Sequence, residues 1–190
     1  MDDSTEVNIL LLGDAECGKS TFLSRISQGP NGAKGASITL LKDMNQPFIF
    51  DIKLSATPYR FQLFDTASPE NWTLLTPNII VLCYDISSRL SLINTQRLWS
   101  KEIHRAFPDP LPVLLLGLKR DLRSETDPNG IIYPQEGYRV AQELRCDKYL
   151  ECSAVSGELL GEVWEDVCRT AVESVKADGG GLSSGGCGVM

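Results

Sequence analysis

The sequence predicts one α/β domain built on a mostly parallel, six-stranded sheet with helices on both faces. Two observations predict this class: short apolar runs alternate with amphipathic segments, and a glycine-rich loop joins the first run to the first helix. The chain of 190 residues is long enough for one compact core. Its hydrophobic fraction of 42% and charged fraction of 23% are ordinary for a globular protein.

Six segments have the short apolar or alternating pattern that is typical of strands. They are Val7–Leu12, Phe48–Leu54, Tyr59–Asp65, Asn78–Tyr84, Pro112–Leu116 and Tyr149–Cys152. The tight link Ser55–Pro58 predicts that the second and third segments form an antiparallel hairpin at one edge. Helical segments separate most of the others, which favours parallel pairing for them.

Four segments have the spacing or the punctuation of helices: Ser20–Ser27, Ser91–Phe107, Pro134–Arg145 and Gly157–Lys176. In the last of them, two neighbouring rows of apolar residues at four-residue spacing predict a wide core-facing stripe. After Lys176 the chain becomes Gly/Ser-rich. The sequence therefore predicts a domain over residues 1–176 and a flexible tail over residues 177–190.

Charge and cysteine content restrict the class of protein. The net charge is −7, so the chain lacks the basic character that nucleic-acid partners require. None of the six cysteines forms a CxxC pair, which argues against a zinc site, and the acidic N-terminus has no signal-peptide pattern. No apolar run approaches transmembrane length. We expect a cytoplasmic protein with free thiols, in which Cys83 and Cys168 belong to the core.

The loop Gly13–Ser20 (GDAECGKS) matches the phosphate-binding pattern GxxxxGK[ST]. In such a loop the glycines let backbone N–H groups curl around phosphates, Lys19 is the catalytic cation that reaches the β- and γ-phosphates, and Ser20 offers its hydroxyl to Mg²⁺. A chance match is the alternative, but the preceding strand and the following helix favour a nucleoside triphosphate site. The residues predicted to contact the nucleotide here are Gly13, Asp14, Ala15, Glu16, Cys17, Gly18, Lys19, Ser20 and Thr21.

Three further motifs lie where strands of the predicted sheet end: Asp65-Thr66-Ala67, Leu118-Lys119-Arg120-Asp121 and Cys152-Ser153-Ala154. With these motifs in this order, the chain resembles the Ras superfamily of small GTPases from Val7 to Val175. The segments GDAECGKS, LLGLKRDLR and YLECSAVSGE are most similar to the Rho branch. The resemblance implies the P-loop GTPase fold, GTP or GDP with Mg²⁺ as ligands, and a monomer whose partners are effectors, exchange factors and GTPase-activating proteins.

The same resemblance assigns roles to individual residues. It implies that Asp121 recognises guanine, that Lys119 packs over the base, and that Ser153 and Ala154 contact the base. It implies that Asp65 and, in the first switch, Thr39 join Ser20 around Mg²⁺. An adenine-specific P-loop kinase is a weaker alternative because of the Lys119–Asp121 motif.

Several residues depart from the family pattern. Pro69 stands where the family has the glutamine that orients the attacking water, and Ser68 replaces a glycine that senses the γ-phosphate. Ala15 adds a methyl group near the γ-phosphate, and Leu118 replaces the asparagine of the base-binding motif. We therefore expect slow or absent GTP hydrolysis, with a non-hydrolysing pseudo-GTPase as the alternative, unless Glu70 or a partner supplies the missing group.

Two other features remain from the sequence. Trp72 falls in the presumed second switch, where it is either an exposed contact for a partner or an anchor of a short loop. The chain ends in Cys187-Gly188-Val189-Met190, which matches the prenylation pattern CaaX with a farnesyl-type ending. A single lipid chain on Cys187 predicts weak, reversible attachment at the cytoplasmic face of a membrane.

Overall fold

The computed structural model describes residues 4–29, 38, 40, 47–54, 56–65, 72, 75–124, 126 and 132–180. Its strands are β1 (Thr5–Leu12), β2 (Phe48–Leu54), β3 (Thr57–Asp65), β4 (Ile79–Asp85), β5 (Val113–Leu118) and β6 (Lys148–Glu151). They form one six-stranded sheet in the order β2-β3-β1-β4-β5-β6. Among these strands only β2 is antiparallel to its neighbour, and it pairs with β3 from Phe48 opposite Leu63 to Leu54 opposite Thr57. The predicted sheet and its antiparallel edge pair are confirmed.

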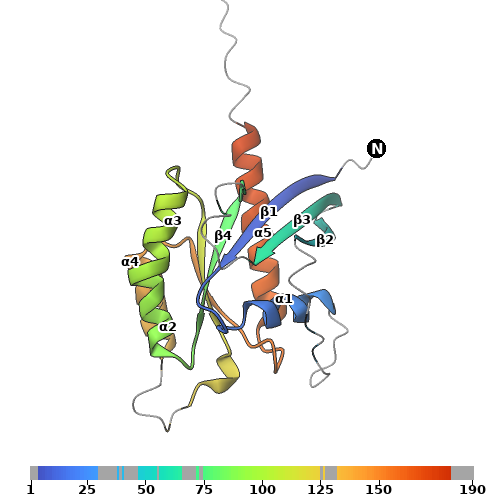
Figure 1. Ribbon diagram of the computed structural model, residues 1–190. Helices are drawn as coiled ribbons and strands as arrows, with labels where there is room; N and C mark the ends of the chain where they lie inside the picture. Colours follow the sequence, from blue (N-terminus) through green and yellow to red (C-terminus); the bar gives the residue numbers. More distant parts are fainter. Residues whose placement is uncertain are drawn as a thin grey trace, which may run out of the picture.

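Helices cover both faces of the sheet, as Figure 1 shows. They are α1 (Lys19–Ser27), α2 (Arg89–Asn94), the π-helical η3 (Thr95–Trp99), α3 (Ser100–Ala106), the 3₁₀-helical η4 (Arg120–Leu122), α4 (Pro134–Glu143) and α5 (Leu160–Gly180). Core residues of α1 and α5 pack on one face, and those of α2, η3, α3 and α4 pack on the other.

Both ends of the last helix differ from the prediction, and the other predicted helices differ by one or two residues at some of their ends. α5 begins at Leu160 and not at Gly157, because Gly157 and Leu159 have positive φ angles of 76° and 56° that an α-helix does not accommodate. It continues to Gly180, past Ala177, where the sequence predicts the tail to begin. Ala177 and Asp178 are compatible with a helix, so the change in composition at Lys176 does not end it.

The segment predicted as one helix over 91–107 contains a π-helical turn. This turn, η3, separates α2 from α3 and shifts the side-chain register between them. Thr95 and Trp99 are turned inward with 0% and 8% exposure, whereas Leu98, which the spacing places with the core residues, is 46% exposed. The π turn therefore selects which residues of this segment reach the sheet.

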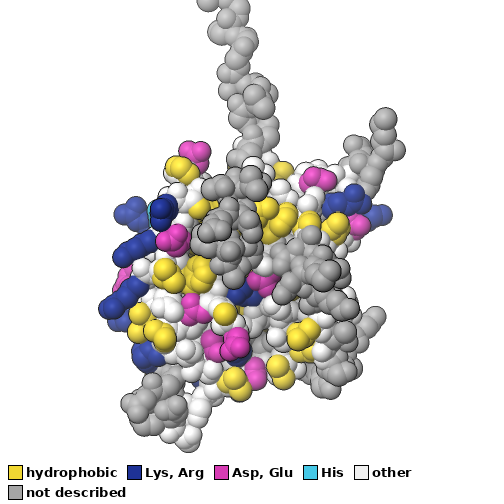
Figure 2. Space-filling model, viewed as in Figure 1, with side chains coloured by type: hydrophobic (Ala, Val, Ile, Leu, Met, Phe, Trp, Pro, Cys, Tyr) yellow, Lys and Arg dark blue, Asp and Glu magenta, His cyan; other side chains and the backbone are white. Residues whose placement is uncertain are grey.

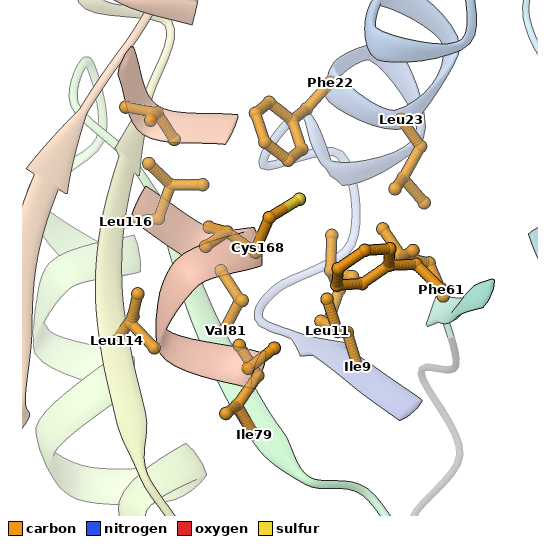
Figure 3. Close-up of a cluster of buried hydrophobic side chains, with 14 of the residues drawn as sticks. Ile9, Leu11, Phe22, Leu23, Phe61, Ile79, Val81, Leu114, Leu116 and Cys168 are labelled. Carbon is orange, nitrogen blue, oxygen red and sulfur yellow. The ribbon is translucent and has the colours of Figure 1, made fainter. Parts of the chain in front are cut away.

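The core lies in two layers on either side of the sheet. β1 shows both: Val7, Ile9 and Leu11 face the α1–α5 layer, and Leu10 and Leu12 face the α2–α4 layer. Figure 3 shows the α1–α5 layer, in which Phe22 of α1, Phe61 of β3 and Cys168 of α5 meet over the strands. Strands of a covered parallel sheet are apolar on both faces, which is why their sequences are nearly continuous apolar runs.

The predicted core positions of Cys83 and Cys168 are confirmed, with exposures of 0% and 2%. Burial raises the pKa of the Cys168 thiol to about 12 and, together with the nearby Glu151 charge, raises that of Cys152 to about 12. The folded state therefore keeps these protons at a pH where an unfolded chain, with an ordinary thiol pKa of 9.0, releases them.

We expect the folded state to lose stability as the pH rises above 9.0, the pKa of an ordinary thiol. The unfolded state then binds fewer protons than the folded state, so the free energy of unfolding falls with rising pH, by about 1.4 kcal/mol per pH unit for each such thiol. Urea unfolding at about pH 8 and about pH 10, on either side of the ordinary thiol pKa, measures the loss, which should total about 1.4 kcal/mol for each such thiol over that interval. Cys168→Ala should reduce the slope by one thiol's share, and an unchanged slope would contradict the assignment.

Gly137 of α4 lies where the helix meets two tyrosines. A Cβ atom on Gly137 would stand 2.2 Å from the Tyr149 hydroxyl oxygen and 2.6 Å from that of Tyr84. These hydroxyls are hydrogen-bonded to each other at 2.9 Å, and Tyr149 also donates to Glu151. Only glycine therefore lets α4 pack this closely on the sheet.

We expect Gly137→Ala to lower the free energy of unfolding by about 1–3 kcal/mol, since overpacking outweighs the gain in helix propensity. The matched control is Gly161→Ala in α5, where no atom lies within 4 Å of the added Cβ. That variant should gain about 0.5 kcal/mol from helix propensity. Equal effects of the two substitutions in urea unfolding would contradict the packing argument.

Candidate functional site

The loop between β1 and α1 takes a conformation that depends on two glycines. Gly13 has a φ of 142°, and a Cβ atom there would stand 2.3 Å from the carbonyl oxygen of Cys83 in β4. Gly18 has a φ of 110° and forms the N-cap of α1. The loop can thus pass close to β4 and then start a helix, which leaves the first N–H groups of α1 directed into the loop.

Lys19 is buried at the centre of this loop, with 7% exposure. Its Nζ donates hydrogen bonds to the carbonyl oxygens of Gly13 at 3.0 Å and Asp14 at 2.9 Å. It lies 4.0 Å from Oδ1 of Asp65 at the end of β3. An ammonium group held in this way is a fixed positive charge inside a ring of backbone atoms, which suits a phosphate.

Ser20 and Asp65 meet beside Lys19, and the Ser20 hydroxyl donates to Oδ2 of Asp65 at 2.9 Å. A hydroxyl and a carboxylate are hard oxygen donors, and Mg²⁺ in nucleotide sites takes one or two such ligands together with phosphate and water. Among the described residues there is no group of three or more His, Cys, Asp or Glu side chains that would hold a metal by themselves. The donor set therefore fits Mg²⁺ that arrives with a triphosphate. Thr39, the third predicted ligand, lies outside the described residues.

The remaining loop residues occupy distinct environments. Ala15 and Glu16 are exposed, and Gly18 and Thr21 are half-buried. Cys17 is buried, and its Sγ lies 3.9 Å from Nζ of Lys19. Burial raises the pKa of the Cys17 thiol, and the adjacent ammonium group offsets that only in part. Cys17 is therefore a protonated packing residue rather than a reactive thiolate.

A second loop lies at the ends of β5 and β6 and contains the residues predicted to contact a base. The hydroxyl of Ser153, which is fully buried, donates to Oδ1 of Asp121 and accepts from the N–H of Ser156. Asp121 itself is exposed, so its other carboxylate oxygen is open to a ligand. Ala154 follows with 7% exposure. The structure thus brings Asp121, Ser153 and Ala154 together, as the sequence predicts.

Lys119 joins this second loop to the phosphate loop. Its Nζ donates to the carbonyl oxygen of Glu16 at 2.7 Å and to Oδ2 of Asp85 at 2.7 Å. Leu118, which stands in place of an asparagine, is 1% exposed, and its side chain lies 3.6 Å from the point where a Cβ atom added to Gly18 would stand. A buried apolar side chain therefore stands where the family has a hydrogen-bonding asparagine.

Asp85 is a site residue that the sequence analysis missed. It ends β4, and its Oδ1 accepts from both the N–H and the hydroxyl of Ser87, while Oδ2 holds Lys119. Its place at the carboxyl end of a central parallel strand is the signal that would have indicated it, since functional residues gather at this edge. Asn94 and Trp99 were also missed as neighbours of the phosphate loop: both donate to the carboxylate of Asp14.

Trp72 is not the exposed partner contact that was one of its two predicted roles. It is 0% exposed and stacks on Trp99, with ring centroids 6.1 Å apart and ring planes at 30°. Large apolar side chains that reach the core are stabilised there by burial, which outweighs their place in a short loop. Trp72 therefore belongs to the core of the α2–α4 layer.

Several predicted features lie outside the described residues. They are Thr39, Thr66–Glu70 with Ser68 and Pro69, and the tail from residue 181 to Cys187 and the chain end. In the part of the chain that is described, no helix is both long and apolar enough to cross a bilayer.

On the face shown in Figure 2, Lys and Arg side chains gather on the side of α2, η3 and α3. Exposed cations of this strip include Arg97, Lys101 and Arg105.

Comparison with known proteins decides the family. A family model described as Ras family matches residues 8–173, which include all the loops described above. The chain belongs to the Ras family. Its six-stranded sheet and phosphate loop are those of a Ras-like P-loop GTPase domain.

Among Ras family members, the chain is similar to Rho-type proteins of fungi. It is 31% identical to GTP-binding protein rho1 of Schizosaccharomyces pombe over 180 residues, which cover 86% of this chain and 85% of the relative. It is 30% identical to rho5 of the same organism over 183 residues, or 88% of each chain. It is 28% identical to GTP-binding protein RHO2 of Saccharomyces cerevisiae over 187 residues, or 90% of this chain and 92% of the relative. The chain is therefore a Rho-like member of the family.

Proposed function

We propose that this Rho-like protein binds GTP and GDP with Mg²⁺ and acts as a signalling switch with slow intrinsic hydrolysis. The observation that carries the proposal is the cluster of Lys19, Ser20 and Asp65 in and beside the phosphate loop. The relatives named above are themselves called GTP-binding proteins, which supports the same ligand.

Each residue of the cluster has a role that follows from its place. Lys19 neutralises phosphate charge, and the N–H groups at the start of α1 orient the phosphates. Ser20 and Asp65 are the groups that would hold Mg²⁺, which supplies neutralisation of charge on the β- and γ-phosphates. Asp121, fixed by Ser153, accepts from the guanine donors, and Lys119 lies over the base while it braces Glu16.

Slow hydrolysis is proposed from Pro69, which stands at the position of the water-orienting glutamine. Proline has neither an amide side chain nor a backbone N–H, so it cannot orient a water molecule by donating to it. Ser68 in place of the γ-phosphate-sensing glycine supports a second candidate, a pseudo-GTPase that acts as a protein interaction module.

Two measurements separate these candidates. Nucleotide extracted from the purified full chain should be GTP or GDP, and protein that stays empty and ignores added GTP would favour the pseudo-GTPase. In single-turnover assays, we expect wild-type hydrolysis to be slow and Pro69→Gln to raise its rate by about tenfold or more, within the range that general catalytic positioning supplies. Fast wild-type hydrolysis would contradict the proposal, and Pro58→Gln in the edge hairpin is the matched control.

Membrane attachment through a prenyl group on Cys187 is part of the proposal, as are exchange factors, GTPase-activating proteins and effectors as partners. The terminal CaaX pattern supports the lipid, and one chain would give reversible attachment at a cytoplasmic membrane face. Mass spectrometry of the protein from eukaryotic cells should show a farnesyl mass on the C-terminal peptide. An unmodified C-terminus would contradict it.

A further inference from the structure

The side chain of Asp14 links the phosphate loop to the opposite face of the sheet. Its Oδ2 accepts from Nδ2 of Asn94 at 2.9 Å, and its Oδ1 accepts from Nε1 of Trp99 at 2.7 Å. Asn94 is the last residue of α2, and Trp99 is the last residue of η3. Both oxygens of one carboxylate are thus held by neutral donors from a single helical stretch.

Asp14 places a negatively charged side chain in a loop that is proposed to bind negatively charged phosphates. Neutral donors leave the negative charge of the Asp14 carboxylate in place, but they hold both of its oxygens on the helical stretch, so the carboxylate is not free to turn toward the phosphates. The main chain of Asp14 is held as well, because its carbonyl oxygen accepts from Nζ of Lys19 at 2.9 Å. Asp14 is therefore fixed through its side chain and through its backbone.

The π-helical turn explains how two donors five residues apart reach the same carboxylate. In an α-helix, five residues rotate through about 500°, so their side chains point about 140° apart. In η3 the i→i+5 turn brings such positions to the same side of the helix. The turn thus places Asn94 and Trp99 together, and π turns of this kind are frequent at functional sites.

Trp99 also contacts Trp72. Its ring stacks on Trp72, which is fully buried, at 6.1 Å between ring centroids. One indole therefore touches the phosphate loop through its N–H and Trp72 through its ring face. No other tryptophan does this, because Trp164 lies on α5 against Phe50 and Phe61 in the other core layer.

We propose that Trp99 and Asn94 are positioning residues for the nucleotide site. Both hold the Asp14 carboxylate, so that the phosphate loop keeps its conformation, and Trp99 also connects that loop to Trp72. This inference rests on the proposed function, because it requires that the loop bind GTP or GDP. In this proposal the π-helical turn supports the phosphate loop through the two side chains that contact Asp14.

The first test compares two tryptophan substitutions in the full chain. Trp99→Phe keeps an aromatic ring beside Trp72 but removes the N–H that reaches Asp14, and Trp164→Phe is the matched control. We expect Trp99→Phe to release a fluorescent GDP analogue about tenfold faster than wild type, the effect of one hydrogen bond to a charged group, and the control to release it at the wild-type rate. Equal rates for the two variants, with wild type binding normally, would overturn the inference alone. Wild type that binds no guanine nucleotide would overturn the proposed function first.

A rescue experiment keeps the inference testable if Trp99→Phe fails to fold. Asn94→Asp sets two carboxylates together and should speed release by about tenfold or more. Adding Asp14→Asn reverses donor and acceptor, so the double variant should recover most of the wild-type rate, whereas Asp14→Asn alone pairs with Asn94 once the Asn94 amide turns its oxygen inward. A merely structural role predicts additive losses, and additivity would overturn the inference.

The link to Trp72 has its own readout. In the Trp164→Phe variant, the tryptophan emission comes only from Trp72 and Trp99, since the chain has three tryptophans. We expect this emission to change when GDP and Mg²⁺ are removed with a chelator and to recover when they are restored. Emission that ignores nucleotide would overturn the connection between the loop and Trp72.

Discussion

Lys19→Ala should lower the affinity for GTP and GDP by a factor of about 100 to 1,000, because the phosphates lose two charge-assisted hydrogen bonds of about 1.5–3 kcal/mol each, partly replaced by water. The Lys19 ammonium is buried and fixed by the Gly13 and Asp14 carbonyl groups, so no other cation can take its place without moving the loop. Titration with a fluorescent guanine nucleotide measures the change, and circular dichroism checks that the variant is folded.

The matched control for this variant is Lys101→Ala. Lys101 is exposed on α3 and outside the phosphate loop, so its removal changes the net charge by the same amount but leaves the site intact. We expect wild-type affinity for the control at physiological salt. If Lys19→Ala binds within about threefold of wild type, the phosphate site lies elsewhere and the proposed function is wrong.

Asp121→Asn should change which base the protein prefers. Guanine presents an N–H and an amino group, and a carboxylate accepts from both, whereas an amide offers a donor to one of them. Xanthine carries a carbonyl oxygen in place of that amino group, so it suits an asparagine. We expect affinity for GTP to fall by about 100-fold or more and affinity for xanthosine triphosphate to rise, because a site built to hydrogen-bond one set of polar groups discriminates strongly against a base that leaves them unpaired.

The Ser153 hydroxyl makes this prediction specific to the structure. It donates to Oδ1 of Asp121, so in the variant it selects the rotamer in which the amide oxygen faces Ser153 and the N–H₂ faces the base. Competition between GTP and xanthosine triphosphate measures the preference. Asp109→Asn, an exposed change of the same kind in the link before β5, should have no effect. An unchanged preference in Asp121→Asn would show that this loop does not recognise the base.

Much of the candidate site could be predicted because its parts are local in sequence. The loop Gly13–Ser20 joins a strand to a helix, and the residue types that curl around a phosphate are adjacent in the chain. Asp65, Asp121 and Ser153 end or follow strands, and the carboxyl ends of parallel strands meet at one edge of a sheet. The structure places all of them at that edge.

The residues that the prediction missed depend on contacts between distant segments. Asp85 has no motif of its own and gains its place only when β4 lies between β1 and β5. Trp99 has the spacing of a packing residue, and its N–H meets Asp14 across 85 positions of sequence. The π turn in η3 also leaves no clear mark, since each of its residues is compatible with an ordinary α-helix.

The sequence by itself determined the strands, the antiparallel edge hairpin, the phosphate loop and the motif order that indicates a guanine nucleotide, because each depends on residues close together in the chain. The tertiary structure alone decided that Trp72 is buried, that Lys119 braces Glu16 and Asp85, and that Asn94 and Trp99 hold Asp14. These facts arise when the chain buries apolar surface on both faces of the sheet and must then pair the polar groups that packing brings together.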